Sequence, residues 1–281
     1  MKKHFIFLAF LGAILHHISI AQVGNRYSYE LFPLFQKSTT LIVLDDKETS
    51  YNRMMRKIIA EQWKVTPYEF VRFSEMNELL PAEGYSMLYK SRRAVKNLQQ
   101  SKVQSHSDIA LVMCNREKWS DFGGIDEIAS VDLENIDDTA NYVYKLPMLI
   151  GGVLQYLQYL HQEEIDRYNF DYPLMICLNK NVNWLKTKRL WVVKEELPVN
   201  LQDSSQFASA YPFPFQMASR EQAKQIVVSK NSAAVLLYFT PKFHEVMALD
   251  IETNKIIYRA EPLRYEDFSI ADVKKLAKRI K

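Results

Sequence analysis

One apolar stretch, residues 144–161, most constrains the fold of this chain. Its large aliphatic residues recur at steps of three, four and seven, which places them on one stripe of a helix: Leu146, Leu149, Ile150, Val153, Leu157 and Leu160. A lysine, a proline, two glycines and several glutamines interrupt the stretch, whereas a bilayer-crossing helix needs about 20 predominantly apolar residues. The pattern therefore predicts a central amphipathic core helix between the two halves of the chain, and no transmembrane segment in the mature protein.

Residues 1–21 have the pattern of a secretory signal peptide. Lys2 and Lys3 give a basic start, residues 5–15 are apolar, and Ser19 and Ala21 supply the small residues of a cleavage site. We expect cleavage after Ala21 and a periplasmic or secreted protein beginning at Gln22. No cysteine lies near this site, so the sequence does not predict a lipid anchor.

Composition excludes several classes of function for the exported chain. Loss of residues 1–21 removes two lysines and no acid, so the formal charge of +3 falls to +1, and no basic face suggests a nucleic-acid partner. Cys114 and Cys177 each lie in an apolar run, which favours buried thiols, although a disulfide between them stays open. No histidine is paired with a cysteine at ligand spacing, so neither a metal site nor a cofactor is expected.

The first half has alternating strand and helix patterns. After an extended amino-terminal segment (residues 22–38), a near-continuous apolar strand is predicted at residues 39–44, an amphipathic helix at 50–63 and a second strand at 68–73. This order predicts a βαβ unit with parallel strands. Beyond it we expect a short helix at 74–80, strands at 85–90 and 109–114, and between those strands a basic loop at 91–107.

The second half has the same kinds of strand and helix pattern. Strands are predicted at residues 189–194, 233–239, 245–251 and 255–260, and an amphipathic helix follows Ser269. Pro67, Phe70 and Ser74 align with Pro212, Phe215 and Ser219, which suggests a duplicated αβ module in which each serine caps a helix. The alternative is coincidence between two generic junctions, and the polar stretch 198–210 suggests divergence where the first half has a helix.

The predicted fold class is therefore α/β, with two related αβ modules and mixed sheets around the central helix. The expected divisions are residues 39–138 for the first module, 139–170 for the central helix and 171–281 for the second module with its carboxy-terminal helix.

The acidic pair after the first strand is the most suggestive chemical feature. Asp45 and Asp46 resemble the magnesium-binding acids of a response-regulator receiver domain. A receiver also needs an aspartate at the end of a later strand, where this chain has Cys114 and Asn115 instead. The favoured interpretation is structural, because acids are common at strand ends and helix amino termini.

Other fragments of catalytic motifs are incomplete. His244 and Glu245 begin like a zinc-protease motif without its second histidine, and Asp121-Phe122-Gly123 lacks the other kinase signatures. Gly84 to Leu88 lacks the second glycine of a nucleophile elbow, and no glycine-rich phosphate loop is present. Aromatic residues could line a ligand groove, but such side chains are more often part of a core.

The first third of the chain is similar to a group of exported proteins of Bacteroidota with no known activity. The resemblance rests on the signal peptide, on T-T-L-I-V-L-D-D at residues 39–46, on E-Q-W at 61–63 and on T-P-Y-E-F at 66–70. It implies a periplasmic or secreted αβ protein, and it carries no catalytic residue over to this chain.

Two functions follow as hypotheses. The first is a binding or assembly module of the cell envelope, whose partner is an envelope protein or a small ligand. The second is an envelope hydrolase that uses Asp45 and Asp46 together with Arg72 or His106. Open αβ sheets bind ligands at the carboxyl ends of their strands. A concave pocket there holding these groups would favour the enzyme, and a flat or filled strand end would favour the binding module.

Overall fold

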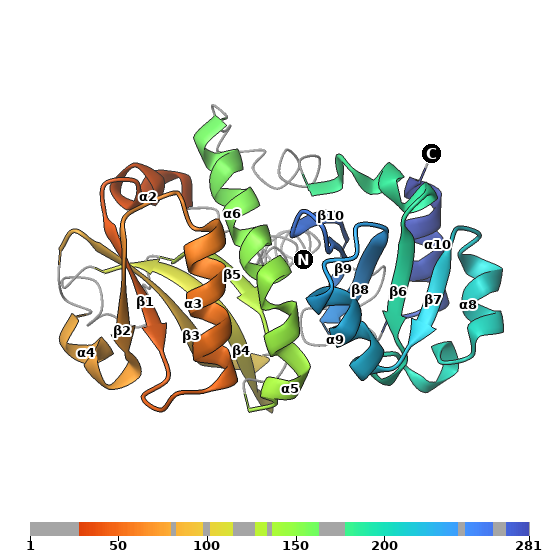
Figure 1. The fold of residues 1–281 in the computed structure, drawn as a ribbon, viewed down its shortest axis with the longest axis horizontal. Coiled ribbons are helices and arrows are strands. Elements are labelled where there is room, and N and C mark those ends of the chain that lie inside the picture. Colours follow the sequence, from red (N-terminus) through yellow and green to blue (C-terminus); the bar gives the residue numbers. More distant parts are fainter. Residues whose placement is uncertain are drawn as a thin grey trace, which may run out of the picture.

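The computed structural model describes residues 28–79, 83–97, 102–114, 127–133, 137–162, 178–240, 245–260 and 268–280. The predicted signal peptide, the Asp121-Phe122-Gly123 motif, Cys177 and His244 lie outside these residues. The described chain contains two five-stranded sheets, one in each half (Figure 1).

The first module comprises helices, 3-10 turns and strands in the following order: α2 (Ser28–Phe35), β1 (Thr39–Leu44), α3 (Ser50–Gln62), β2 (Tyr68–Arg72), η1 (Phe73–Glu75), α4 (Met76–Leu79), β3 (Tyr85–Asn97), β4 (Lys102–Met113), β5 (Glu127–Asp132), α5 (Thr139–Tyr142), η2 (Val143–Lys145) and α6 (Leu146–Gln162).

The second module follows with a similar order: η3 (Val182–Lys186), β6 (Arg189–Val193), η4 (Lys194–Glu196), η5 (Val199–Leu201), α8 (Ser204–Ala210), β7 (Phe215–Ala218), α9 (Arg220–Val228), β8 (Ala234–Thr240), β9 (Glu245–Asp250), β10 (Lys255–Ala260) and α10 (Ile270–Arg279).

The two sheets have the same topology. The first has the order β2-β1-β3-β4-β5 and the second β7-β6-β8-β9-β10. In each, the first three strands are parallel and the last two are antiparallel to their neighbours. In each, the last ladder also contains a bulge, with Ile128 as the extra residue in β5 and Ile257 in β10. The predicted α/β class with two related modules is confirmed.

The strand registers correct the sequence alignment by two residues. The N–H of Thr40 in β1 donates to the carbonyl of Pro67, and the N–H of Leu190 in β6 donates to that of Pro214. Pro67 therefore corresponds to Pro214 and not to Pro212. A shift of two residues keeps every strand side chain on its own face, which is why the wrong alignment still fitted the apolar pattern.

The same shift corrects the predicted helix caps. Ser219 caps α9, where its hydroxyl accepts the N–H of Gln222 and the Gln222 amide accepts the N–H of Ser219. Ser74 does not play this part, because it lies inside η1. Arg72 precedes that turn, and the Glu75 carboxylate accepts its N–H at 2.8 Å. The prediction that Ser74 is an N-cap was wrong.

The helices also correspond between the modules. Helix α8 lies between β6 and β7 as α3 lies between β1 and β2, so the predicted divergence over residues 198–210 is wrong. Each module ends in a helix, α6 after β5 and α10 after β10, and these contact α3 and α8 respectively. The predicted central helix is thus the last helix of the first module.

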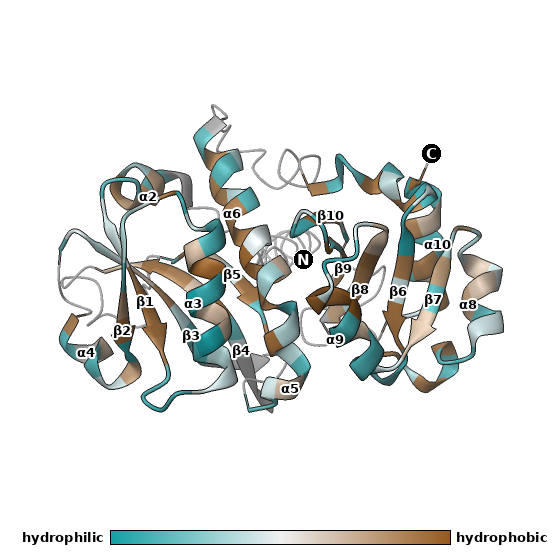
Figure 2. Ribbon diagram, in the orientation of Figure 1, coloured by the Kyte–Doolittle hydropathy of each residue, from teal (hydrophilic) through white to brown (hydrophobic). Residues whose placement is uncertain are grey.

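Helix α6 stands between the two sheets (Figure 1) and contacts both β5 and β10. All six aliphatic residues of its predicted stripe are buried, and one apolar cluster joins them to side chains of both sheets. The predicted amphipathic core helix is confirmed. Figure 2 shows the apolar strands β1, β6 and β8 beside helices of mixed character. A second cluster lies between the second sheet and helices α8 and α10.

Helix α6 approaches the second module closely at its two glycines. A Cβ added to Gly151 would lie 1.8 Å from the backbone oxygen of Asn254, and one added to Gly152 would lie 2.7 Å from Cδ1 of Ile256. The side-chain amide of Gln155 also bonds the N–H and the carbonyl of Ile256 in the edge strand β10. Residues that interrupt the apolar pattern of this helix therefore form its contact with the second module.

Three other predictions for the first half need correction. Residues 91–97 and 102–107 are paired strand in a long β3–β4 hairpin, and not a basic loop. Strand β5 was not predicted, although all six of its residues are buried. Residues 28–35 form helix α2, which contacts β5 and buries Phe35, and are not extended.

Candidate functional site

The candidate site begins at the carboxyl end of β1, where Asp45 is held in place by its neighbours. Its Oδ2 accepts the hydroxyl of Thr49 at 2.8 Å, and its Oδ1 lies 2.5 Å from the ammonium of Lys90 on β3. The buried side chain of Asn52 accepts the N–H of Asp45 and donates to its carbonyl. Thr49 itself caps α3. Both carboxylate oxygens of Asp45 are therefore engaged in positioning the β1–α3 loop.

Asp46 has a different role from the one predicted, because it binds the first turn after β2 and does not cap α3. Its Oδ1 accepts the N–H of Ser74 at 2.8 Å. Hydrogen bonding from Ser74 and, to a smaller extent, the positive charge of Arg72 hold the pKa of Asp46 below its ordinary value of 3.8. The Asp46 side chain is exposed and lines the pocket described next.

A pocket of about 240 Å³ opens at this strand end. It is lined by Leu44, Asp45, Asp46, Glu48, Asn52, Arg56, Phe70, Val71, Arg72 and Glu75. The guanidinium of Arg56 stacks on the ring of Phe70 at 5.0 Å. None of these described lining residues is a serine, cysteine or histidine, so the pocket offers carboxylates, guanidinium groups and hydrogen bonds but no hydroxyl, thiol or imidazole nucleophile of those three residue types.

A pair of buried tyrosines lies behind Asp45. The ammonium of Lys90 is 4.2 Å from the ring centroid of Tyr51, whose ring packs edge-on against that of Tyr142. Burial raises the pKa of both phenols, and the negative charge of Asp45 adds to the effect. Both tyrosines therefore stay neutral, and the Tyr51 hydroxyl donates to the carbonyl of Val43.

The second module has an acidic pair at the corresponding place. Glu195 and Glu196 follow β6 as Asp45 and Asp46 follow β1, although the hydrogen bonds match Glu195 to Asp46. Glu195 accepts the N–H of Arg220 at the start of α9, much as Asp46 accepts that of Ser74. In both modules an acid after the first strand thus binds the helical turn that follows the second strand.

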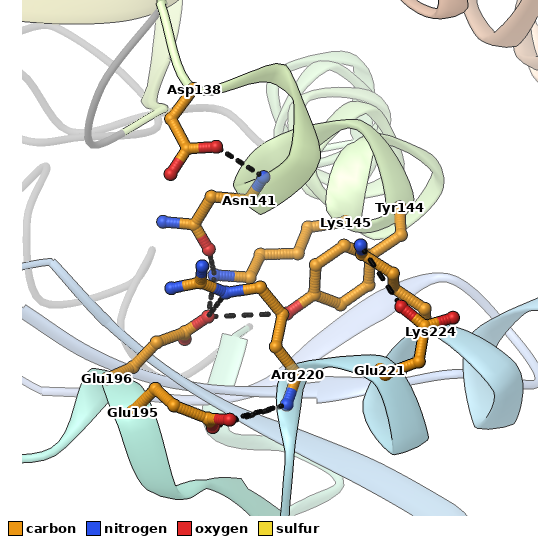
Figure 3. A network of polar contacts seen from close by, with 9 residues as sticks. All are labelled: Asp138, Asn141, Tyr144, Lys145, Glu195, Glu196, Arg220, Glu221 and Lys224. Carbon is orange, nitrogen blue, oxygen red and sulfur yellow. Dashed lines mark hydrogen bonds and ion pairs between the residues drawn. The ribbon is translucent and has the colours of Figure 1, made fainter.

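Glu196 is paired with a lysine, as Asp45 is, but this lysine comes from the other module (Figure 3). The fully buried ammonium of Lys145 lies 2.7 Å from Oε1 of Glu196, and the hydroxyl of Tyr144 donates to the same oxygen at 3.3 Å. The guanidinium Nε of Arg220 is 4.0 Å away. The Lys145 ammonium also lies 4.7 Å from the ring centroid of Tyr238. This strand end is therefore occupied by a cation from within the chain.

The structure brings together three of the four predicted site residues. Asp45, Asp46 and Arg72 line one pocket, and the fourth residue is His106. Its backbone pairs with Arg93 in the part of the β3–β4 hairpin beyond the end of β1, and its side chain lies outside the description.

Cys114 is a buried free thiol, and burial raises its pKa to about 11, which makes it unreactive. Tyr211 and its neighbours Phe213 and Phe215 pack on the second core, as the favoured interpretation of these aromatic residues expected.

Sequence reasoning missed Lys90, Lys145 and the acids Glu195 and Glu196. A lysine inside an apolar stretch was a usable signal for Lys145, because buried lysines usually have an acidic partner. The second acidic pair is matched only when β1 is aligned with β6 directly, because the alignment of Pro67 with Pro214 sets Asp45 against Val192.

Among the described residues, no group of three histidines, cysteines or acids is placed to hold a metal ion. None of the described helices is long and apolar enough to cross a membrane. No family model, no curated protein and no solved structure matches this chain.

Proposed function

We propose that this protein is an exported envelope component that binds a small polar group in the pocket at the carboxyl ends of β1 and β2. One observation carries the proposal: this strand end is hollowed and lined by charged side chains, whereas Lys145 occupies the corresponding end in the second module. Strand ends of this kind are the usual ligand sites of open αβ sheets.

The state of the acids favours binding over catalysis. Asp45 has both oxygens engaged, and the lowered pKa of Asp46 makes it a weak base at neutral pH. The hydrolase alternative has the concave pocket in its favour, since it joins Asp45 and Asp46 with Arg72. It lacks a histidine, serine or cysteine among the described lining residues, so any base or nucleophile would have to be a carboxylate.

The binding test uses the mature chain, residues 22–281, in thermal-shift and native mass-spectrometry measurements with a panel of polar metabolites and short peptides. At least one compound should raise the melting temperature of the wild type and fail to do so with Glu48→Trp, which fills the pocket. Glu221→Trp on α9 is the control, because its side chain is 71% exposed and away from the pocket lining. A panel without any binder that distinguishes these variants would overturn the proposal.

The hydrolase alternative is tested by incubating the same protein with ester, phosphate and glycoside substrates. Turnover by the wild type that is lost in folded Asp46→Ala would displace the binding account. Export is tested separately by mass spectrometry of the envelope fraction, in which we expect a chain beginning at Gln22 and without residues 1–21.

A further inference from the structure

We propose that residues 5–20 dock, in the uncleaved chain, on the back face of the first sheet, defined as the face turned away from α3. Cleavage after Ala21 would uncover this face, so the proposal deepens the assembly role within the proposed function and rests on its export. The internal duplication supplies the argument, because α6 covers the matching face of the second sheet.

The back face is apolar and buried. Every second side chain of β1, β3 and β4 points to it, and none of these side chains is more than 7% exposed: Leu41, Val43, Met87, Tyr89, Ala110, Val112 and Cys114. Among the described apolar residues, Met76 and Leu79 of α4 are those that pack on this cluster from outside the sheet. A helix of 4 residues is too short to cover three strands, so a further part of the chain covers them.

The matching face of the second sheet shows which elements belong there. The N–H of Cys114 donates to the first residue of β3, and the N–H of Ile251 donates to the first residue of β8. Cys114 therefore matches Ile251, and Val112 matches Leu249 two residues earlier. Ile251 and Leu249 lie in one apolar cluster with the stripe of α6 and with side chains of α9. Helix α4 follows β2 as α9 follows β7, so α4 is the counterpart of α9, and the segment to identify is the counterpart of α6.

Sequence order and composition select residues 5–20 as this segment. Helix α6 precedes β6, the first strand of the sheet that it covers, and residues 5–20 likewise precede β1. They contain no aspartate, glutamate, lysine or arginine, whereas the other long segments outside the description, residues 115–126 and 163–177, carry both acids and bases. Burial of such charges on an apolar face is costly.

The lengths agree with this placement. Helix α6 has 17 residues, and a helix over residues 5–20 would be about 24 Å long, slightly more than a strand of six residues. Helix α2 contacts β4 and β5 and packs in the cluster on the α3 side of the sheet. Residues 21–27 reach up to about 25 Å when extended, and the layers on opposite sides of a sheet are about 20 Å apart. The chain can therefore pass round the edge strand β5.

Cys114 reports on the back face, because it is a free thiol in this cluster and burial raises its pKa to about 11. The test compares the uncleaved chain, residues 1–281, with residues 22–281, both produced without export and both carrying Cys177→Ser. We expect iodoacetamide to modify Cys114 at least about tenfold faster in the shorter chain, where the thiol is uncovered. Equal rates would overturn the proposal, since the cover would then lie within residues 22–281.

A single substitution tests the same contact without shortening the chain. Leu11→Asp in the uncleaved chain should raise the rate to that of the shorter chain, because a carboxylate in the apolar run resists burial on this face. Lys2→Asp is the matched control, because it adds the same carboxylate outside residues 5–20 and should leave the rate unchanged. Equal rates in these two variants would contradict the proposal.

A second thiol shows whether the shorter chain stays folded. Ala248 is fully buried in the second core, so Ala248→Cys in the C114S/C177S background should stay protected in both chains. If it reacts in the shorter chain, disulfide formation in the uncleaved chain decides. Native Cys114 should then pair with at least one of Leu8→Cys, Leu11→Cys and Leu15→Cys.

Rival covers are tested in the same way with Trp119→Cys and Phe170→Cys, which lie in the two charged segments. Pairing of Cys114 with either of these, or with no introduced cysteine, overturns the docking of residues 5–20. Such a failure leaves the proposed function standing, because the pocket lining and the ligand panel do not involve this segment.

Discussion

At the scale of single residues, a buried chain of hydroxyl groups ties helix α3 to the start of the first sheet. The indole N–H of Trp63 donates to Thr66, whose Oγ1 lies 2.6 Å from that of Thr40, and Thr40 continues to Ser86. All four residues are buried, so each hydroxyl depends on the next for its hydrogen bond.

Replacing Thr66 by Val should lower the free energy of unfolding by about 1–3 kcal/mol, because it leaves the Trp63 N–H without its acceptor and Thr40 with one partner fewer. Urea denaturation followed by tryptophan fluorescence measures this loss. Thr187→Val is the control, since the exposed Thr187 hydroxyl bonds only the Trp184 carbonyl. Equal stability of the two variants would show that the buried hydrogen bonds of Thr66 add nothing to the free energy of unfolding.

The lowered pKa of Asp46 predicts how the stability of the protein depends on pH. The pKa is lower in the folded state than the ordinary 3.8, so the carboxylate stabilises the fold above that value and loses its contribution as the pH falls through the folded-state pKa. The difference in urea midpoint between wild type and Asp46→Asn should be constant at pH 5–7 and shrink below pH 4. A difference that grows on acidification would contradict this assignment.

At the scale of elements, the two neighbouring glycines of α6 differ in how much an added methyl group should destabilise the protein. Alanine is the better helix former by about 1 kcal/mol, so propensity alone favours both Gly→Ala changes. Gly151→Ala should nevertheless destabilise the protein by about 1–3 kcal/mol, because its Cβ would meet the rigid carbonyl of Asn254 and push the modules apart.

Gly152→Ala is the matched control for this prediction. Its Cβ would meet the end of the Ile256 side chain, which can move, so the melting temperature should fall less than in G151A. If calorimetry finds G151A as stable as G152A or more so, the close approach between α6 and the β9–β10 hairpin is not maintained in solution.

At the scale of the whole molecule, the modules are joined by an apolar interface that contains a buried ion pair. Across this interface the carboxylate of Glu196 accepts a hydrogen bond from the Lys145 ammonium. The Tyr238 hydroxyl of β8 donates to the carbonyl of Asp132 in β5. An unpartnered buried charge is costly, so such a pair penalises any arrangement of the modules that separates it.

Lys145→Met should lower the free energy of unfolding by about 3–5 kcal/mol, because it leaves the Glu196 carboxylate buried without its ammonium. The double variant K145M/E196Q should recover much of this loss, since the Glu196 carboxylate is then removed as well. Lys224→Met, which breaks only the 3.4 Å surface pair with Glu221, should change stability by less than about 0.5 kcal/mol. Additive losses in the double variant would show that the two residues do not interact.

The sequence by itself determined the elements whose signal is local. Continuous apolar runs specified β1, β6 and β8, the stripe on α6 specified a buried helix, and repeated junctions indicated the duplication. These predictions succeed because the burial and the side-chain periodicity of an element can be read from residues that are neighbours in the sequence. Strand β5 and the outer part of the β3–β4 hairpin, residues 91–97 and 102–107, were missed. A polar or alanine-containing strand is fixed by cross-strand pairing and not by its own composition.

Only the tertiary structure decided what the charged residues do. Asp46 and Ser74 are 28 residues apart, and Lys145 and Glu196 are 51 apart, so their contacts follow from how strands and modules are arranged. Sequence identified the acidic pair Asp45 and Asp46 but not that a lysine fills the matching place in the second module. Electrostatic interactions act between groups that are close in space, and that closeness is set by packing across the sheets rather than by position along the chain.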